Sequence, residues 1–308
     1  MDFLISVLEQ GLIYGIMALG VYITYKILDF PDLSVDGTFP LGAAVTAALI
    51  KAGVNPYLTL PIAFAAGLAA GICTGLIHVK FKVRDLLSGI IVMTGLYTVN
   101  LFIAGTNNVP LFSTDTIFRN EMLSGFFGDN IPQWLDIVII LIIVLICKVL
   151  LDLYMKTQSG YLLRAVGDND VIVTALAKDK GNVKILGLAI ANGLVALSGC
   201  VFAQQSRVFD ISMGTGALVI GLASVIIGLS FFRRLSFVKT TTAVIVGSIF
   251  YKACVALALK FAGATATKLI TAVLFLLILI VSVDRKKKVK INAVSYTHLR
   301  AHETEADL

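Results

Sequence analysis

A series of apolar runs, most of them about 20 residues long, divides this chain, and short charged segments separate the runs. A run of that length can cross the hydrocarbon core of a bilayer as a helix. The chain of 308 residues is 58% hydrophobic and 14% charged, and its mean hydropathy is +0.93. A soluble domain carries about a quarter charged residues. The sequence therefore predicts an all-α polytopic integral membrane protein.

The order of the runs and of the basic segments predicts about nine transmembrane crossings, with the N-terminus outside and the C-terminus inside. Lysines and arginines gather in segments 80–84, 233–239 and 285–290, which the positive-inside rule assigns to the cytoplasm. Because the net charge of +6 comes from these clusters, it does not indicate nucleic-acid binding. The expected crossings are 3–28, 41–51, 57–79, 86–105, 134–155, 185–202, 213–232, 240–259 and 268–283.

The segment 29–40 interrupts the pattern directly after the first crossing. It contains two prolines, one glycine and three aspartates, so it cannot form a helix that faces lipid. Irregular backbone at membrane depth is tolerated where it is buried in protein or lines a wet cavity. We interpret the segment as part of a discontinuous second helix, and the alternative is a plain loop between two full spans. The residues predicted to line a pathway here are Asp32, Ser34, Asp36, Gly37, Thr38 and Phe39.

The segment 159–184 is the most polar interior part of the chain and lies between two long apolar runs. Asp168 or Asn169 can cap a short helix, and Gly181 can end it as a C′ residue. Ile172, Ala175 and Leu176 fall on one face at helical spacing. An amphipathic helix outside the membrane suggests a surface that docks on another protein. The alternative is an ordinary loop with a frayed surface helix.

The pattern Arg164-Ala165-x-Gly167-x-Asn169, followed by Ala175 and by Gly181-Asn182-Val183, resembles the cytoplasmic coupling loop of ABC-importer permeases of the branched-chain amino acid and ribose type. The segment 32–42 resembles a subgroup associated with amino-acid import, including aromatic amino acids. In that family a short helix of the loop inserts into a separate ATPase subunit. The residues that the resemblance assigns to this contact are Arg164, Ala165, Gly167, Asp168, Asn169, Ile172, Ala175, Leu176 and Gly181.

The resemblance also implies the partners and the location of the chain. It implies an ATPase dimer on the cytoplasmic side, a substrate-binding protein or lipoprotein outside, and a second permease subunit, identical or paralogous. The location would be the bacterial cytoplasmic membrane. The transported solute would be an amino acid.

Several motifs of catalysis are missing from the sequence. It contains no Gly-x-x-x-x-Gly-Lys-Ser/Thr loop and no cluster with metal-ligand spacing. We therefore expect a transport subunit that is not an enzyme and binds no cofactor, with ATP used by the partner ATPase. The alternatives are an ion-coupled secondary transporter and, further away, an intramembrane enzyme. The docking loop distinguishes an ABC permease from a secondary transporter, since a secondary transporter does not dock on an ATPase.

Lys252 lies about midway along the crossing 240–259. A central lysine costs about 2.5–3.5 kcal/mol on insertion scales, so it needs a partner or a wet cavity. Three readings remain open. The side chain reaches the outer interface, it neutralises Glu9 or Asp36, or it faces the pathway and meets a solute carboxylate.

The division into domains is simple. Residues 1–290 form one transmembrane permease domain, and residues 291–308 form a polar tail. The last part, 295–308, resembles translated adaptor or vector sequence, so we exclude it from function.

Overall fold

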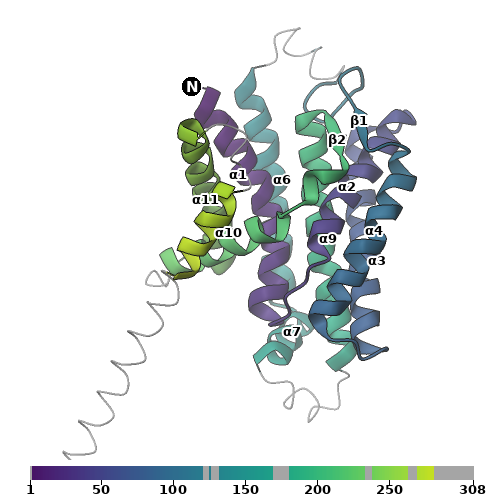
Figure 1. The fold of residues 1–308 in the computed structure, drawn as a ribbon, viewed down its shortest axis with the longest axis vertical. Helices are drawn as coiled ribbons and strands as arrows, with labels where there is room; N and C mark the ends of the chain where they lie inside the picture. Colours follow the sequence, from purple (N-terminus) through teal and green to yellow (C-terminus); the bar gives the residue numbers. More distant parts are fainter. Residues whose placement is uncertain are drawn as a thin grey trace, which may run out of the picture.

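The computed structural model describes residues 2–120, 125, 132–168, 180–232, 238–262 and 269–280, and these residues form an α-helical bundle (Figure 1). The long helices are α1 (Asp2–Tyr22), α2 (Val35–Lys51), α3 (Thr59–Val79), α4 (Asp85–Ala104), α6 (Gln133–Tyr154), α7 (Gln158–Asp168), α9 (Lys180–Ser206), α10 (Ala217–Phe231) and α11 (Thr240–Ala262). The shorter elements are the π-helical turn η1 (Ile23–Ile27), the 3-10 turns η2 (Pro56–Leu58) and η3 (Ile211–Gly214), and the strands β1 (Asn108–Pro110) and β2 (Val208–Asp210).

The predicted fold class is confirmed. Within the described ranges, seven helical segments are long and apolar enough to cross a membrane. A shorter apolar helix covers Leu269–Ile280, and α2 has 17 residues. The expected total of about nine crossings stays a prediction.

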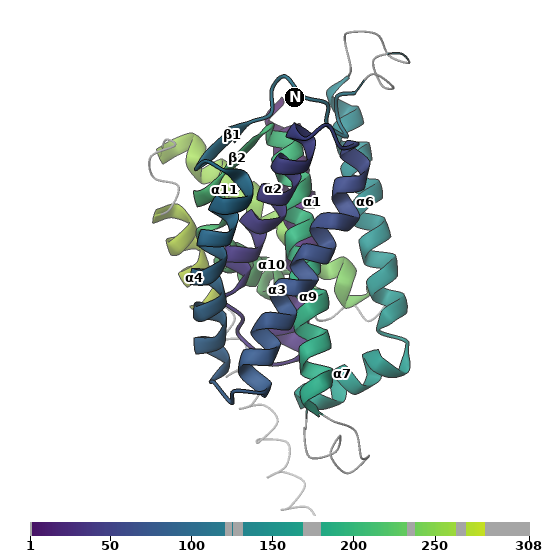
Figure 2. The ribbon, with the colours of Figure 1, turned by 90° about the vertical axis from the view of Figure 1, so that its right-hand side faces the viewer.

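Helix α9 lies at the centre of the bundle and packs against α1, α2 and α3 (Figure 2). Three glycines of α3, four residues apart, make the contact with α3 close. A Cβ atom on Gly67 or Gly71 would overlap the carbonyl oxygen of Asn192 or Leu188, and one on Gly75 would lie 2.9 Å from Ile185 Cα. Small residues of this kind let two helix backbones approach in a membrane, where dispersion contacts hold helices together.

The two ends of the bundle differ in structure. At one end, β1 and β2 pair antiparallel, with Val109 opposite Phe209, and α1 begins at this same end (Figures 1 and 2). At the other end lies α7. The segments that the sequence assigns to the outside thus lie opposite the segment that it assigns to the cytoplasm, as the predicted topology requires.

The prediction for the start of the second helix is wrong by six residues. We expected irregular backbone as far as Pro40, but α2 begins at Val35 and includes Pro40. The proline is tolerated because this part of α2 is buried in protein and never faces lipid. Proline lacks the N–H that would bond to the carbonyl of Asp36. Gly214 packs against that carbonyl and against the Pro40 ring, where a Cβ would overlap the oxygen.

Candidate functional site

The break between α1 and α2 contains a buried network of polar side chains around Asn192 of α9. The Asn192 amide nitrogen donates to Asp32 Oδ2 at 2.8 Å and to the Leu188 carbonyl at 3.1 Å. The hydroxyls of Ser34 and Thr38 donate to Asn192 Oδ1 at 3.1 and 2.8 Å. All four side chains of this Asp32–Ser34–Thr38–Asn192 network are fully buried. The network therefore ties the start of α2 to the central helix.

Asp32 also organises the irregular backbone itself. Its Oδ1 accepts the Ser34 amide at 2.9 Å, which forms a turn before α2 begins. Among the described residues, no cation pairs with this carboxylate. Hydrogen bonds from Asn192 and Ser34 take the place of a counter-ion, and such bonds are what a buried carboxylate requires.

Asp36 joins α2 to the start of α10. Its two carboxylate oxygens accept the backbone amides of Gly216 at 3.0 Å and Leu218 at 2.8 Å. This is an N-cap contributed by a different helix, placed where the helix dipole favours a negative charge. Gly216 has a φ of +82°, a conformation that glycine adopts readily.

Helix α7 contacts the end of the first span through a glycine. A Cβ on Gly167 would overlap the carbonyl oxygen of Ile27, the last residue of η1. Nearby, Leu163 is fully buried, and its side chain and that of Leu28 both lie against Gly187 of α9. The α7–η1 contact therefore places α7 directly against the backbone that leads into the break.

Only part of the predicted coupling segment lies within the described residues. Arg164, Ala165, Gly167 and Asp168 lie in α7, and the Arg164 side chain is exposed. Asn169, Ile172, Ala175 and Leu176 lie outside the described residues. The expectation that Gly181 ends a helix is wrong, because Gly181 is the second residue of α9. The contact of all these residues with an ATPase stays a prediction.

Asp152 connects two helices at the α7 end of the bundle. It accepts the Thr241 hydroxyl at 2.7 Å and lies 3.3 Å from Lys148 Nζ and 3.2 Å from Lys239 Nζ. The carboxylate on α6 is thereby held to the first turn of α11. Tyr22 of α1 donates to Thr240 at 3.1 Å, so the end of α1 joins the same cluster.

Two other predicted pathway residues are buried in packing contacts. Phe39 stacks on Tyr14 with ring centroids 5.6 Å apart and also contacts Phe202. Gly37 packs against Met93 of α4, where a Cβ would lie 3.1 Å from the backbone. The structure brings these residues together with Asp32, Ser34, Asp36 and Thr38 around the start of α2. A role in lining the pathway stays a prediction for all of them.

Lys252, the remaining predicted pathway residue, lies on α11 and is partly buried. Its Nζ lies 3.6 Å from the centroid of the Tyr14 ring. Within the described ranges, Lys252 forms a salt bridge with neither of the two carboxylates that the sequence suggests as its partner. Glu9 accepts Gln205 Nε2 at 2.9 Å, and Asp36 caps α10.

Asn192 is the residue of this network that the sequence does not assign to the site. It stands out in the sequence as a polar side chain in an apolar run, which marks a functional or structural position in a membrane helix, but no role follows from that alone. Its partners could not be identified, because all but Leu188 lie in a segment far away in the sequence.

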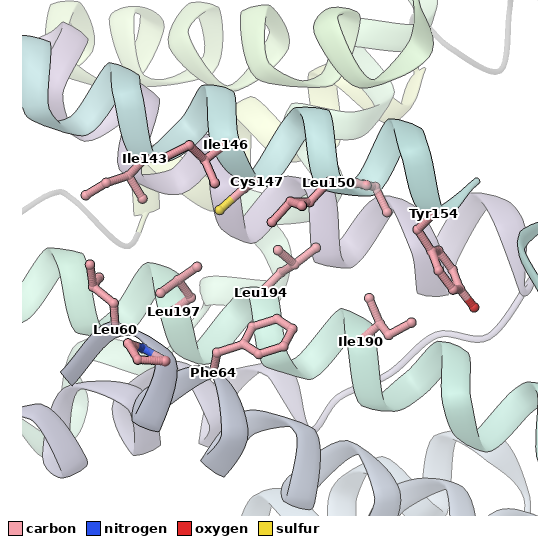
Figure 3. A pocket seen from close by; sticks show the side chains of 12 residues that line it. Leu60, Phe64, Ile143, Ile146, Cys147, Leu150, Tyr154, Ile190, Leu194 and Leu197 are labelled. Atoms are coloured by element: carbon pink, nitrogen blue, oxygen red, sulfur yellow. The ribbon is translucent and has the colours of Figure 1, made fainter. Parts of the chain in front are cut away.

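A groove of about 490 Å³ opens between α3, α6 and α9, but its lining argues against a polar solute (Figure 3). Phe64, Cys147 and Leu194 point toward it, and its other lining side chains are almost all apolar. A zwitterion would lose its hydration there without gaining hydrogen bonds. The polar sites at the break and at Lys252 are therefore the better candidates.

The chain is similar to known proteins over most of its length. The family described as "Branched-chain amino acid transport system / permease component" matches residues 3–282. The tyrosine transport system permease protein of Clostridioides difficile (strain R20291) is 47% identical over 277 residues, which is 90% of each chain. No solved structure matches this chain.

More distant relatives carry other names. The ribose import permease protein RbsC of Escherichia coli (strain K12) is 25% identical over 73% of this chain and 68% of its own length. The probable branched-chain amino acid transport permease protein LivH of Methanocaldococcus jannaschii is 25% identical over 70% of each chain. The chain therefore belongs to the permease components of the branched-chain amino acid transport family, as a multi-pass transmembrane subunit of an ABC importer in the bacterial cytoplasmic membrane.

Proposed function

We propose that this permease imports an aromatic amino acid of the tyrosine type. The observation that carries the proposal is the 47% identity, over 90% of both chains, with a permease named for tyrosine transport. The polar residues at membrane depth support it, because a zwitterion needs charged and hydrogen-bonding groups along its path. The apolar groove between α3, α6 and α9 offers neither.

The same proposal includes the partners. A separate ATPase dimer docks on the cytoplasmic segment that contains α7 and uses ATP, while this chain carries out no chemical step. A substrate-binding protein delivers the solute at the end where β1 and β2 pair, and a second permease subunit completes the membrane part. The α7–η1 contact at Gly167 supports the coupling role, because it joins the docking segment to the pathway break without an intervening side chain.

Uptake by the reconstituted complex tests the proposal. The permease would be purified with its ATPase and binding protein and placed in proteoliposomes. Accumulation of radiolabelled tyrosine would be compared with that of leucine and ribose. We expect ATP-dependent uptake of tyrosine that exceeds that of the other two solutes by at least about 10-fold, a difference of 1.4 kcal/mol in selectivity.

Two outcomes would contradict the proposal in different ways. Uptake driven by a proton or sodium gradient without ATP would point to a secondary transporter. ATP-dependent uptake of ribose or leucine in preference to tyrosine would keep the transport mechanism and overturn the solute.

A further inference from the structure

The position of Lys252 in the bundle follows from the packing of α1 against α11. Gly11 contacts Ile249, and Gly15 contacts Ser248 and Ile245, so the two helices run antiparallel with these residues level. The backbone of Lys252 therefore lies about level with Gln10, nearer to the end where α1 begins. Its ammonium nevertheless reaches the ring of Tyr14, about one helical turn further from that end.

This direction excludes the interpretation in which the Lys252 side chain reaches the nearer membrane interface. Side chains of an α-helix lean toward its N-terminus. The N-terminus of α11 lies at the α7 end, where Thr241 donates to Asp152. The Lys252 side chain follows that lean and points toward the middle of the membrane. It does not reach back to the nearer interface.

A cavity of about 130 Å³ lies directly beside this lysine. It begins at the exposed residues Phe3 and Ser6 and continues inward to Gln10 and Lys252. The remaining lining residues are Val7, Val255, Ala256 and Leu259. Because complete ligand pockets measure about 300–1,000 Å³, this cavity suits one charged end of a solute.

The charge of Lys252 is not balanced by the residues around it. Its Nζ makes a cation–π contact with the Tyr14 ring, and among the described residues no carboxylate forms a salt bridge with it. The carboxylate of Glu9, one position from Gln10, is held by Gln205 of α9. A cation–π contact stabilises an ammonium only partly, and an anion at the inner end of the cavity, beside Gln10 and Lys252, would complete its environment.

We propose that Lys252, with Gln10, forms a subsite that binds the carboxylate of the transported amino acid. The proposal rests on the proposed function for the identity of the solute. The ammonium supplies the charge, and the Gln10 amide supplies a further donor. Tyr14 holds the ammonium in place and is itself held by Phe39 and Phe202.

Thiol labelling in the assembled transporter tests this subsite. Cys73, Cys147, Cys200 and Cys254 would first be replaced, and Ser6→Cys would place one thiol at the cavity mouth. The rates of reaction with an anionic and a cationic methanethiosulfonate reagent would then be compared. We expect Lys252→Met to reduce the preference for the anionic reagent on the order of 10-fold, because a unit charge that lines the same cavity is removed. Lys252→Arg should keep the preference.

Lys260→Met is the matched control, since it removes the same charge from an exposed position of α11 that does not line the cavity. It should leave the preference unchanged. An equal loss in both variants would mean that the reagents sense only surface charge, and would overturn the subsite.

Protection by ligands tests the subsite in the protein that retains Lys252, so the result does not depend on how well a Lys252 variant folds. Tyrosine and 3-(4-hydroxyphenyl)propionate should slow the labelling of the Ser6→Cys thiol, whereas tyramine, which lacks the carboxylate, should not. Equal protection by tyramine, or no protection by tyrosine in complexes that transport it, would overturn the subsite while the proposed function stands. A failure of tyrosine uptake itself would contradict the proposed function instead.

Discussion

Replacing Gly167 by alanine tests whether α7 transmits movement to the membrane part. The added methyl group would overlap the Ile27 carbonyl oxygen, and the atom it meets is backbone, which cannot rotate away. Helix α7 would have to shift by about 1–2 Å, which is the size of helix movements in allosteric transitions. Overpacking of this kind costs about 1–3 kcal/mol. A coupling free energy of that size corresponds to about a 5- to 150-fold change between linked sites.

We therefore expect Gly167→Ala to lower the amount of solute transported per ATP hydrolysed by at least about 5-fold. The measurement is uptake and ATP hydrolysis by the same proteoliposomes. Gly95→Ala is the matched control, because a Cβ there would have no atom within 4 Å although the residue also lies in a helix. If Gly167→Ala transports as much solute per ATP as Gly95→Ala, the α7–η1 contact does not carry the coupling.

Three further predictions concern the free energy of unfolding of the purified permease, and each cost below is a decrease in that free energy. The unfolding temperature of each variant shows the order of the losses. Asn192→Ala removes the hub of the buried network, including a bond to a carboxylate, and should cost about 3–5 kcal/mol; a loss no larger than that of Thr38→Val would contradict the network. Asp36→Ala should cost about 0.5–2 kcal/mol by removing the cap of α10, and Asp36→Asn should recover part of it. Asp152→Ala should cost about 1 kcal/mol or less, since its lysine partners are partly in solvent; that cost should shrink in high salt.

The membrane helices could be predicted from the sequence because the bilayer imposes two simple requirements. A span must be long enough and must satisfy its own backbone hydrogen bonds, and both requirements can be read from local composition. The break after α1 was also predictable, since Pro31 and the aspartates cannot face lipid. Its end was not, because Pro40 is accommodated by Gly214, and no local pattern shows that contact.

The candidate site was predictable as a set of unusual residues but not as a set of contacts. Asp32, Ser34 and Thr38 were identified by their position in the break, yet their common partner Asn192 is on another helix. Lys252 was identified by the cost of a charge in the membrane. The proposal for its role uses the level of α11 relative to α1, which depends on the packing of Gly11 and Gly15 and cannot be read from the sequence.

Under the proposed docking of an ATPase at α7, the contacts around η1 connect that segment to the middle of the membrane. Gly167 meets the backbone at Ile27, and the chain then passes through the break to Asp32, which is bound to α9 through Asn192. Asp36, four residues further on, holds the first amides of α10. A movement of α7 therefore acts on backbone and on buried hydrogen bonds rather than on flexible side chains. Since packed interfaces of this kind change between discrete arrangements and do not deform continuously, a small displacement of α7 can move α2 and α10 together.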